Sequence, residues 1–243
     1  MDRLIYTALT GMRARTAAQA VTANNLANAG VIGFRRELSS LASRYIAGPE
    51  GNARVQADDA VTSASADPGR VTPTGQPLDV ALDGSGWIAV QAADGNEAYT
   101  RRGDLRIAPT GVLESGDGHP VMGNAGAITI PPGGEVSIAP DGSVGVRLPG
   151  ALASAVVDRI RLVDPAAGDL RKDAAGLFRT TTVPDAAPAV RLQTQALESA
   201  NVDTARGLVE VIEQARGFDV NTKLLTMTRE IDESGARLMR LDN

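Results

Sequence analysis

The sequence predicts an α+β protein in which N- and C-terminal helices pair as a coiled-coil-like hairpin or bundle, with an inserted all-β domain between them. Two observations favour this fold. Both ends of the chain read as amphipathic helices with a seven-residue apolar repeat, whereas the middle is rich in Gly, Pro and short alternating apolar runs. We expect an N-terminal helical arm, a linker or extended loop, a β-rich domain and a C-terminal helical arm, at residues 1–47, 48–70, 71–190 and 191–243.

The N-terminal helix is predicted by apolar or small residues that recur at spacings of three, four or seven and so form one stripe along a helix. The stripe is broken only by Gln19 and consists of Ile5, Leu9, Met12, Thr16, Ala23 and Leu26. We expect this helix to end between Asn28 and Gly33, because asparagine and glycine tolerate the left-handed backbone that stops helices.

The C-terminal helix carries apolar residues at every seventh position, as in the seam of a coiled coil. One row holds Val211, Phe218, Leu225 and Met239, and a neighbouring row holds Leu208, Ala215, Thr222 and Ala236, with interruptions at Arg229 and Asp232. The N-cap is expected within residues 199–203. Each helix alone also fits an ordinary long helix packed on its own domain. Two such helices at opposite chain ends favour a helical hairpin or a multi-chain bundle instead.

Opposite charges on the two arms favour contacts between them. Residues 1–47 carry six arginines against two acidic side chains, a net charge of +4, and residues 196–243 carry nine acidic against six basic side chains, a net charge of −3. Exposed ion pairs contribute only about 0–1 kcal/mol each, so the opposite charges set the register of the two helices more than the strength of their contact. Because helices this poor in bulky apolar residues are marginal alone, we expect the arms to stay loose until a partner covers them.

The middle of the chain changes to a period of two. Leu78, Val80 and Leu82 alternate with small or acidic residues, and a second alternating run follows from Trp87 to Gln91. Turn signals such as Asp94-Gly95 and Asp141-Gly142 then recur roughly every 8 to 12 residues, which is typical of an all-β sandwich or barrel.

Composition excludes several classes of function. A net charge of −5 and an aromatic content of 3% argue against a nucleic-acid binder. Cysteine is absent, which excludes disulfides, thiolate nucleophiles and cysteine-based zinc sites. No apolar run is long enough to span a membrane, and the first 30 residues lack the pattern of a secretory signal. We expect no membrane insertion, and export would need another route.

The sequence offers no candidate active site. The single histidine, His119, lies in a Gly- and Pro-containing turn and is interpreted as a solvated turn residue. Glu210 and Glu213 fit a solvated helix face better than paired catalytic or calcium-binding carboxylates. Trp87 is interpreted as a core or edge residue of the β domain. We therefore predict no catalytic, cofactor-binding or metal-binding residues, no small-molecule substrate, and no enzymatic activity.

Two terminal motifs resemble those of the bacterial flagellar rod, hook and hook-filament axial family. The first is Ala23-Asn24-Asn25-Leu26-Ala27-Asn28 followed by Gly33-Phe34, and the second is SANVDTARGLVEVIEQARGFDVNTK from Ser199 to Lys223. Segments between them, such as LDVALDGSGWIAV and IAPDGSV, are similar to the β domain of the family. The opening MDRLIYTALTGM and the short length are most similar to the proximal rod members.

This resemblance implies a structural subunit of the flagellar basal-body rod. Such a subunit is exported unfolded through the flagellar type III apparatus and polymerises in the periplasmic space with itself and other rod subunits into the axial drive shaft for swimming. The expected assembly interface comprises Ile5, Leu9, Met12, Asn24, Asn25, Leu26, Asn28, Gly33, Phe34, Asn201, Leu208, Val211, Ile212, Ala215, Phe218, Asn221 and Leu225. Two alternatives stay open: a distal rod or hook subunit, and a secreted β-domain glycan-binding protein or enzyme with oligomerising ends.

Overall fold

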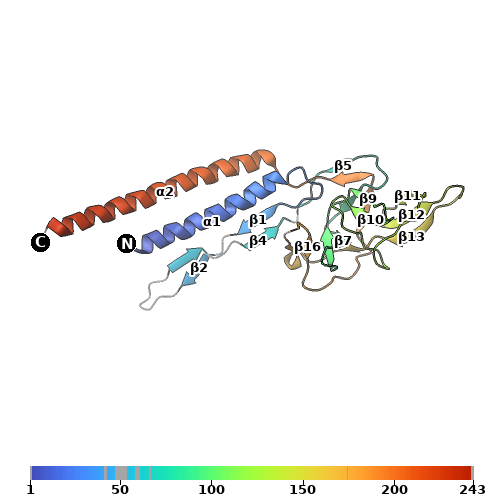
Figure 1. Cartoon of the computed structure of the whole chain (residues 1–243), viewed down its shortest axis with the longest axis horizontal. Helices are drawn as coiled ribbons and strands as arrows, with labels where there is room; N and C mark the ends of the chain where they lie inside the picture. Colours follow the sequence, from blue (N-terminus) through green and yellow to red (C-terminus); the bar gives the residue numbers. More distant parts are fainter. Residues whose placement is uncertain are drawn as a thin grey trace. The chain divides into compact units, whose positions relative to one another are not determined.

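The computed structural model describes residues 2–40, 43–46, 54–57, 61–65, 67–173 and 175–241. Helix α1 (Asp2–Ala27) and helix α2 (Thr204–Leu241) occupy the two ends of the described chain, and the strands lie between them in sequence (Figure 1). The protein is therefore α+β, with helices near the ends and a β-rich middle, as the sequence predicted. Neither described helix is long and apolar enough to cross a bilayer.

The chain forms two compact units. The first comprises the described residues of Met1–Ala27, Glu37–Ser63 and Asp203–Asn243, and the second those of Asn28–Arg36 and Ala64–Val202. The short segment 28–36 thus belongs with the β-rich part of the chain, although it follows directly after α1.

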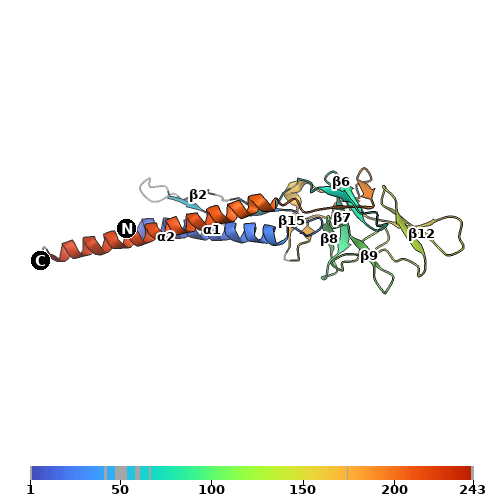
Figure 2. The same cartoon turned by 90° about the horizontal axis from the view of Figure 1, so that it is seen from above.

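The cap of one helix of the first unit lies where the sequence predicted, and the end of the other lies one residue earlier. Helix α1 ends at Ala27, one residue before the predicted range of Asn28 to Gly33, and α2 starts directly after Asp203, whose Oδ1 accepts a hydrogen bond from the backbone N of Arg206 at 3.1 Å. This is N-cap geometry, in which a side-chain oxygen satisfies a free amide of the first turn. Two perpendicular views show α1 and α2 running side by side (Figures 1 and 2). Gln214 Nε2 on α2 donates to Thr22 Oγ1 on α1 at 2.9 Å.

The first unit also contains two small sheets. Strand β1 (Glu37–Ser40) pairs with β4 (Val61–Ala64), and β2 (Ser43–Ile46) pairs antiparallel with β3 (Arg54–Ala57). Strands β3 and β4 fall in the stretch 48–70, which we expected to be a linker or extended loop. Each has only four residues, and the β-branched Val55 and Val61 are the main strand signals among small and polar neighbours.

The second unit is built from short strands. A five-stranded sheet has the order β14-β7-β8-β16-β15, comprising Leu162–Val163, Trp87–Gln91, Glu97–Thr100, Phe178–Arg179 and Arg171–Lys172. A three-stranded antiparallel sheet joins β11 (Glu135–Ile138), β12 (Ser143–Arg147) and β13 (Ala155–Arg159). Strands β9 (Leu105–Ile107) and β10 (Leu113–Ser115) form a further pair, and a short 3-10 helix, η1, covers Ala167–Asp169.

Residues 191–198, which the sequence assigned to the C-terminal arm, form two strands of this unit. Strand β17 (Arg191–Thr194) pairs with β6 (Val80–Asp83), and β18 (Ala196–Glu198) pairs with β5 (Val71–Pro73). Leu192 and Ala196 are buried because this pairing places them against the core. The chain therefore leaves the β-rich unit only a few residues before α2 begins.

Strand β7 separates two apolar clusters. Ile88 and Val90 lie in the main core, which also contains Val80, Leu113, Val144 and Ile160. Trp87 and Ala89, on the opposite face, pack in a second cluster with Tyr99, Val163 and Phe178, and the Trp87 and Phe178 ring centroids are 4.4 Å apart. The alternation in the sequence thus assigned the faces of this strand, and the interpretation of Trp87 as a core residue is confirmed.

The turn between β7 and β8 holds a strongly acidic carboxyl. Gly95, with φ of +82°, forms its tip, and Asp94 accepts hydrogen bonds from Asn96 N and Asn96 Nδ2, both at 3.0 Å. These bonds, with the guanidinium of Arg179, lower the pKa of Asp94 from 3.8 to about 2. A lowered pKa of an acid means stabilisation that is present above pH 3.8 and is lost as the pH falls toward 2.

We therefore expect Asp94 to remain ionised at pH 3 in the folded chain, which NMR titration of its carboxyl group measures. In Asn96→Ala the side-chain bond is lost, and the pKa of Asp94 should rise toward 3.8. A midpoint near 3.8 in the unmodified chain would contradict the role given to this turn.

Candidate assembly interface

One face of α2 is directed at α1. Gln214 contacts Thr22 on this face, and Gly207 lies near Leu26, since a Cβ added to Gly207 would be 3.9 Å from Leu26 Cδ1. Gly217 leaves room for the guanidinium of Arg15, which a Cβ at that position would strike. Two glycines thus let the two helices approach closely, and neither belongs to the seven-residue rows identified in the sequence, whose small residues Ala215 and Thr222 are exposed.

The expected interface residues of α2 fall at different depths. Leu208, Ile212, Ala215 and Phe218 are exposed, and Val211 and Asn221 are half-buried. The side chain of Leu225 lies outside the described residues. On α1, Leu9 is exposed and Met12 and Leu26 are half-buried, while the side chain of Ile5 also lies outside the described residues. Among the described residues, several of these apolar side chains are therefore exposed to a partner molecule.

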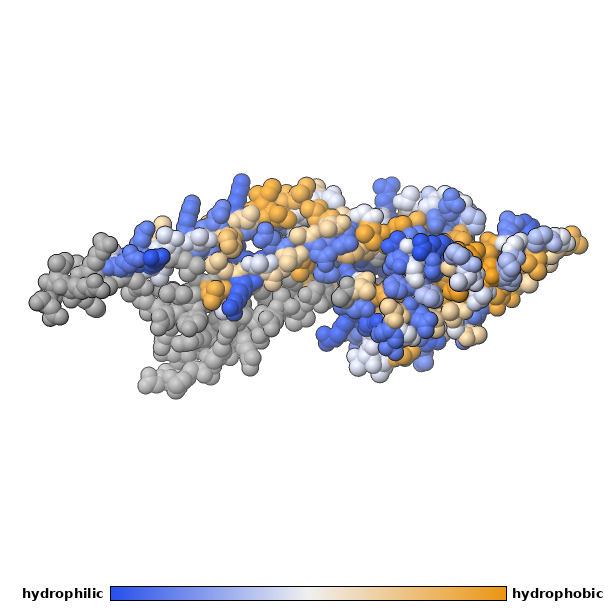
Figure 3. Space-filling view, in the orientation of Figure 1, coloured by the Kyte–Doolittle hydropathy of each residue, from blue (hydrophilic) through white to orange (hydrophobic). Residues whose placement is uncertain are grey.

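A second apolar row on α2 was not identified from the sequence. Its members are spaced by eleven, seven and four residues, which keeps them on one side of a helix, and they are 54–64% exposed: Val209, Val220, Met227 and Ile231. Figure 3 shows orange, apolar surface over the beginning of α2. The seven-residue repeat identified in the sequence does not include these residues. A spacing of eleven, seven and four residues is also a helical apolar pattern.

The asparagines at the end of α1 and directly after it are hydrogen-bonded within the chain. Asn25 is buried, donates from Nδ2 to Glu37 O at 2.9 Å and accepts from Glu37 N at 2.8 Å. Asn24 donates from Nδ2 to Glu37 Oε1 at 3.3 Å. Asn28 is half-buried, and its carbonyl accepts from Val31 N at 3.0 Å. The amide of Asn25 therefore pairs with β1 as a neighbouring strand would.

The two family motifs meet in the β-rich unit. Asn201 Oδ1 accepts from Arg36 N at 2.6 Å, Asn201 N donates to Phe34 O at 3.2 Å, and Asn201 Nδ2 donates to Asp67 O at 2.8 Å. Gly33 N donates to Glu198 O at 2.7 Å. Lys172 Nζ lies 3.8 Å from the centroid of the Phe34 ring. Gly33, Phe34 and Asn201, all expected at the interface, thus form a junction between the segment after α1 and the segment before α2.

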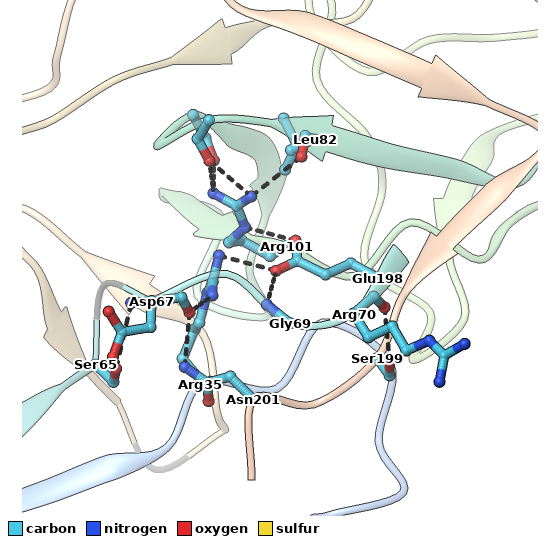
Figure 4. A network of polar contacts seen from close by, with 12 residues as sticks. Arg35, Ser65, Asp67, Gly69, Arg70, Leu82, Arg101, Glu198, Ser199 and Asn201 are labelled. Carbon is cyan, nitrogen blue, oxygen red and sulfur yellow. Dashed lines mark hydrogen bonds and ion pairs between the residues drawn. The ribbon is translucent and has the colours of Figure 1, made fainter. Parts of the chain in front are cut away.

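A buried ionic cluster lies at this junction (Figure 4). Glu198 Oε1 is 3.0 Å from Arg35 Nη2, and Glu198 Oε2 is 2.9 Å from Arg101 Nε, with all three residues at most 2% exposed. Glu198 Oε1 also accepts from Gly69 N at 2.7 Å. Arg101 donates to the carbonyls of Leu82, Gly84 and Gly86, and Arg35 donates to the carbonyl of Asp67. The carboxylate thus holds together segments that are far apart in sequence.

The cluster carries two guanidinium groups against one carboxylate. Burial, with the nearby charge of Arg101, lowers the pKa of Arg35 to about 10, and Glu198 opposes part of this shift. Arg35 remains charged at neutral pH, so its buried charge depends on Glu198 and on the carbonyl of Asp67. The cluster was not predicted from the sequence, where Arg35 was considered only as one of the charges of the N-terminal arm.

The structure brings no catalytic constellation together among the residues that it describes. Over that part of the chain, no three His, Asp or Glu side chains are arranged to hold a metal ion. His119 is half-buried in its turn, with its backbone N bonded to Ser115 Oγ. Glu210 pairs with Arg206 one turn earlier on α2 at 3.1 Å. Among the described residues, the geometry provides exposed apolar helix surface and a hydrogen-bonded junction between the segments 28–36 and 198–202.

Three family models match the chain. They are described as "Flagella basal body rod protein" at residues 5–35, "Flagellar hook protein FlgE/F/G D1 domain" at residues 81–146 and "Flagellar basal body rod FlgEFG protein C-terminal" at residues 193–238. The first and third cover most of α1 and α2, and the second covers much of the β-rich unit.

Individual relatives align over almost their whole length. The chain is 38% identical to the flagellar basal-body rod protein FlgF of Salmonella typhimurium and 37% identical to FlgF of Escherichia coli, in each case over 99% of this chain and 98% of the relative. It is 31% identical to the flagellar basal-body rod protein FlgG of Bacillus subtilis, over 99% of this chain and 100% of the relative. The chain therefore belongs to the flagellar basal-body rod protein family, as a structural rod subunit most like FlgF.

Proposed function

We propose that this subunit polymerises through its terminal helices, which pair as a coiled-coil-like hairpin and present apolar rows to neighbouring rod subunits. The observation that carries the proposal is the exposed apolar surface of α2, where Val209, Val220, Met227 and Ile231 lie on one side of the helix. Burying one such side chain contributes about 1.5–3 kcal/mol, so four of them per subunit provide a substantial driving force for association.

The same helix has two different faces, and this fits an open polymer. One face contacts α1 of the same chain, and the other lies in solvent until a neighbour covers it. Contacts between unlike surfaces of successive subunits are heterologous, and they propagate as a helical array when the rotation does not close. Partners in this array are other copies of the chain and other rod subunits. The proposal assigns the chain no catalytic role, because the family consists of structural proteins.

The family resemblance supports a location and a route. We place the subunit in the part of the basal-body rod that crosses the periplasmic space, reached through the flagellar type III export apparatus. The two alternatives from the sequence are not favoured. The FlgF proteins of Salmonella typhimurium and Escherichia coli share 37–38% of residues with the chain, against 31% for the FlgG protein of Bacillus subtilis.

Met227→Asp tests the proposal, because it places a charge in the apolar row without touching the β-rich unit. Burying the new carboxylate at a subunit contact costs well over 1.4 kcal/mol, which corresponds to at least about a tenfold loss of association. We expect at least tenfold less chain in purified basal bodies and loss of swimming. Phe218→Asp should act in the same way.

The matched control is Thr226→Asp, which adds the same charge at the neighbouring exposed polar position. Its incorporation should stay close to that of the unmodified chain. Fluorescence of Trp87, the single tryptophan, reports whether the β-rich unit of each variant is folded. Normal swimming of the Met227→Asp strain would overturn the proposal.

A further inference from the structure

The segment 28–36, which lies between α1 and β1, packs on the rest of the β-rich unit without adding to its apolar core. Gly33 and Arg35 are its buried residues, and the rest of the segment is half-buried or exposed. Every member of the two apolar clusters lies in the stretch 64–202 instead. Since burial of apolar side chains is the main driving force of folding, this stretch holds what it needs to form the core alone.

Polar contacts hold the segment in place. Gly33 N donates to Glu198 O at 2.7 Å, and Asn201 N donates to Phe34 O at 3.2 Å. Arg35 adds an ion pair with the Glu198 carboxylate at 3.0 Å. Because backbone groups and a guanidinium recover water partners when they are released, docking of the segment can be reversed without exposing the core.

The two arginines of the buried cluster are held differently (Figure 4). Arg101 contacts Glu198 and also donates to three backbone carbonyls. Arg35 contacts Glu198 and donates to one backbone carbonyl, and its Nε is buried with no hydrogen-bond partner among the described residues. Burial and the charge of Arg101 lower the pKa of Arg35 to about 10, so the site disfavours this second positive charge. Arg35 is therefore the less well accommodated of the two.

Without Arg35 the cluster is balanced in charge. Arg101 keeps its contact with Glu198 at 2.9 Å, so that one guanidinium faces one carboxylate, and Gly69 N still donates to Glu198 Oε1 at 2.7 Å. The repulsion between the two guanidinium groups also disappears. The stretch 64–202 is thus complete in charge as well as in core when the segment is released.

Asn25 ties the two ends of the segment together. Its side-chain amide donates to Glu37 O at 2.9 Å and accepts from Glu37 N at 2.8 Å. Both residues belong to the first unit, so these bonds do not depend on the docking of the segment between them. The chain passes between the two units after residues 27, 36, 63 and 202, and the segment accounts for the first two of these passages.

We propose that the segment 28–36 is a latch, which docks through Arg35 on a β-rich body, residues 64–202, that is complete without it, and which undocks while this body stays folded. The inference goes beyond the proposed function, because it concerns a single chain and needs no second subunit. With the latch docked, four passages of the chain tie the two units to each other. With the latch released two passages remain, so its state controls how firmly the terminal helices are tied to the body.

Hydrogen exchange of the full chain in low concentrations of urea tests the latch, because amides that open in separate steps are exposed with separate free energies. Gly33 N, which donates to Glu198 O, reports on the latch. Ala89 N in β7, which donates to Arg161 O at 3.0 Å, reports on the body. We expect the protection of Gly33 to be at least about tenfold lower than that of Ala89 and to depend less on urea. Equal protection of the two amides, or equal dependence on urea, would mean one common opening and would contradict the latch.

Two matched variants make the same change at the two buried arginines. In Arg35→Ala we expect the protection of Gly33 to fall at least about tenfold, while Ala89 stays protected at least about a hundredfold. In Arg101→Ala the body itself loses a guanidinium, so Ala89 should lose its protection or the chain should fail to fold. A smaller fall at Gly33 in Arg35→Ala, or loss of protection at Ala89 in that variant, would show that the segment is not a latch. Continued protection of Ala89 in Arg101→Ala would make the two arginines equivalent, which the proposal excludes.

Discussion

Replacing Glu198 with glutamine is expected to lower the free energy of unfolding of the β-rich unit by about 3–5 kcal/mol, the cost of removing one partner from a buried ion pair. The carboxylate lies 3.0 Å from Arg35 Nη2, 2.9 Å from Arg101 Nε and 2.7 Å from Gly69 N. Without it, two guanidinium groups remain buried and lose the carboxylate that both of them contact. Urea unfolding followed by Trp87 fluorescence measures the loss, since Arg101 lies 5.7 Å from the centroid of the Trp87 ring.

Glu135→Gln is the matched control. It makes the same chemical change in a surface pair with Arg147, where the Glu135 side chain is 71% exposed. Exposed pairs contribute about 0–1 kcal/mol, so this variant should unfold close to the unmodified chain. A loss below about 1 kcal/mol in Glu198→Gln would show that the cluster does not hold the unit together.

Gly33→Ala is expected to lower the free energy of unfolding of the β-rich unit by about 2–5 kcal/mol, for two separate reasons. Gly33 has φ of +67°, and a non-glycine residue in that region costs roughly 1–3 kcal/mol. An alanine Cβ would also lie 2.7 Å from Arg102 N and closer still to the carbonyl of Arg101. Since backbone cannot rotate away as a side chain can, the segment must shift, and the bond from Gly33 N to Glu198 O is strained.

Gly75→Ala separates the two causes. Gly75 has a similar φ of +75°, but nothing lies within 4 Å of a Cβ added there. Its loss in urea unfolding should therefore reflect the backbone conformation alone. Equal losses in the two variants would mean that the close approach between Gly33 and Arg101 has no energetic role.

Local patterns in the sequence were sufficient for the helices and for the β-rich character of the middle. The end of α1 at Ala27 and the cap at Asp203 follow from residues within a few positions of each boundary. The two faces of β7 follow from simple alternation. Such features depend on neighbours in sequence, which a single chain displays directly.

The buried cluster could not be found in this way. Arg35, Arg101 and Glu198 are separated by 66 and 97 positions, and nothing next to any of them distinguishes it from a surface charge. Their burial results from the pairing of β18 with β5 and from the path of the segment after α1. Only a long-range arrangement of strands brings the three together.

The second apolar row of α2 was not predicted from the sequence for a different reason. Its members were visible, but the heptad rows through Val211 and Phe218 offered a simpler periodicity. Both patterns fit the proposed function, because a helix that packs on α1 on one side and on a neighbouring subunit on the other needs more than one apolar stripe. A search for a single seam finds one stripe and passes over the other.

Arg36 is hydrogen-bonded to two other segments of the chain. Arg36 N donates to Asn201 Oδ1 and Arg36 O accepts from Ser65 N at 2.8 Å, so the points where the stretch 65–201 starts and finishes are held together. Because its two ends are held close together, the stretch 65–201 can change in length without moving the segments that lead to α1 and α2. Insertions and deletions within this stretch are therefore compatible with unchanged terminal helices.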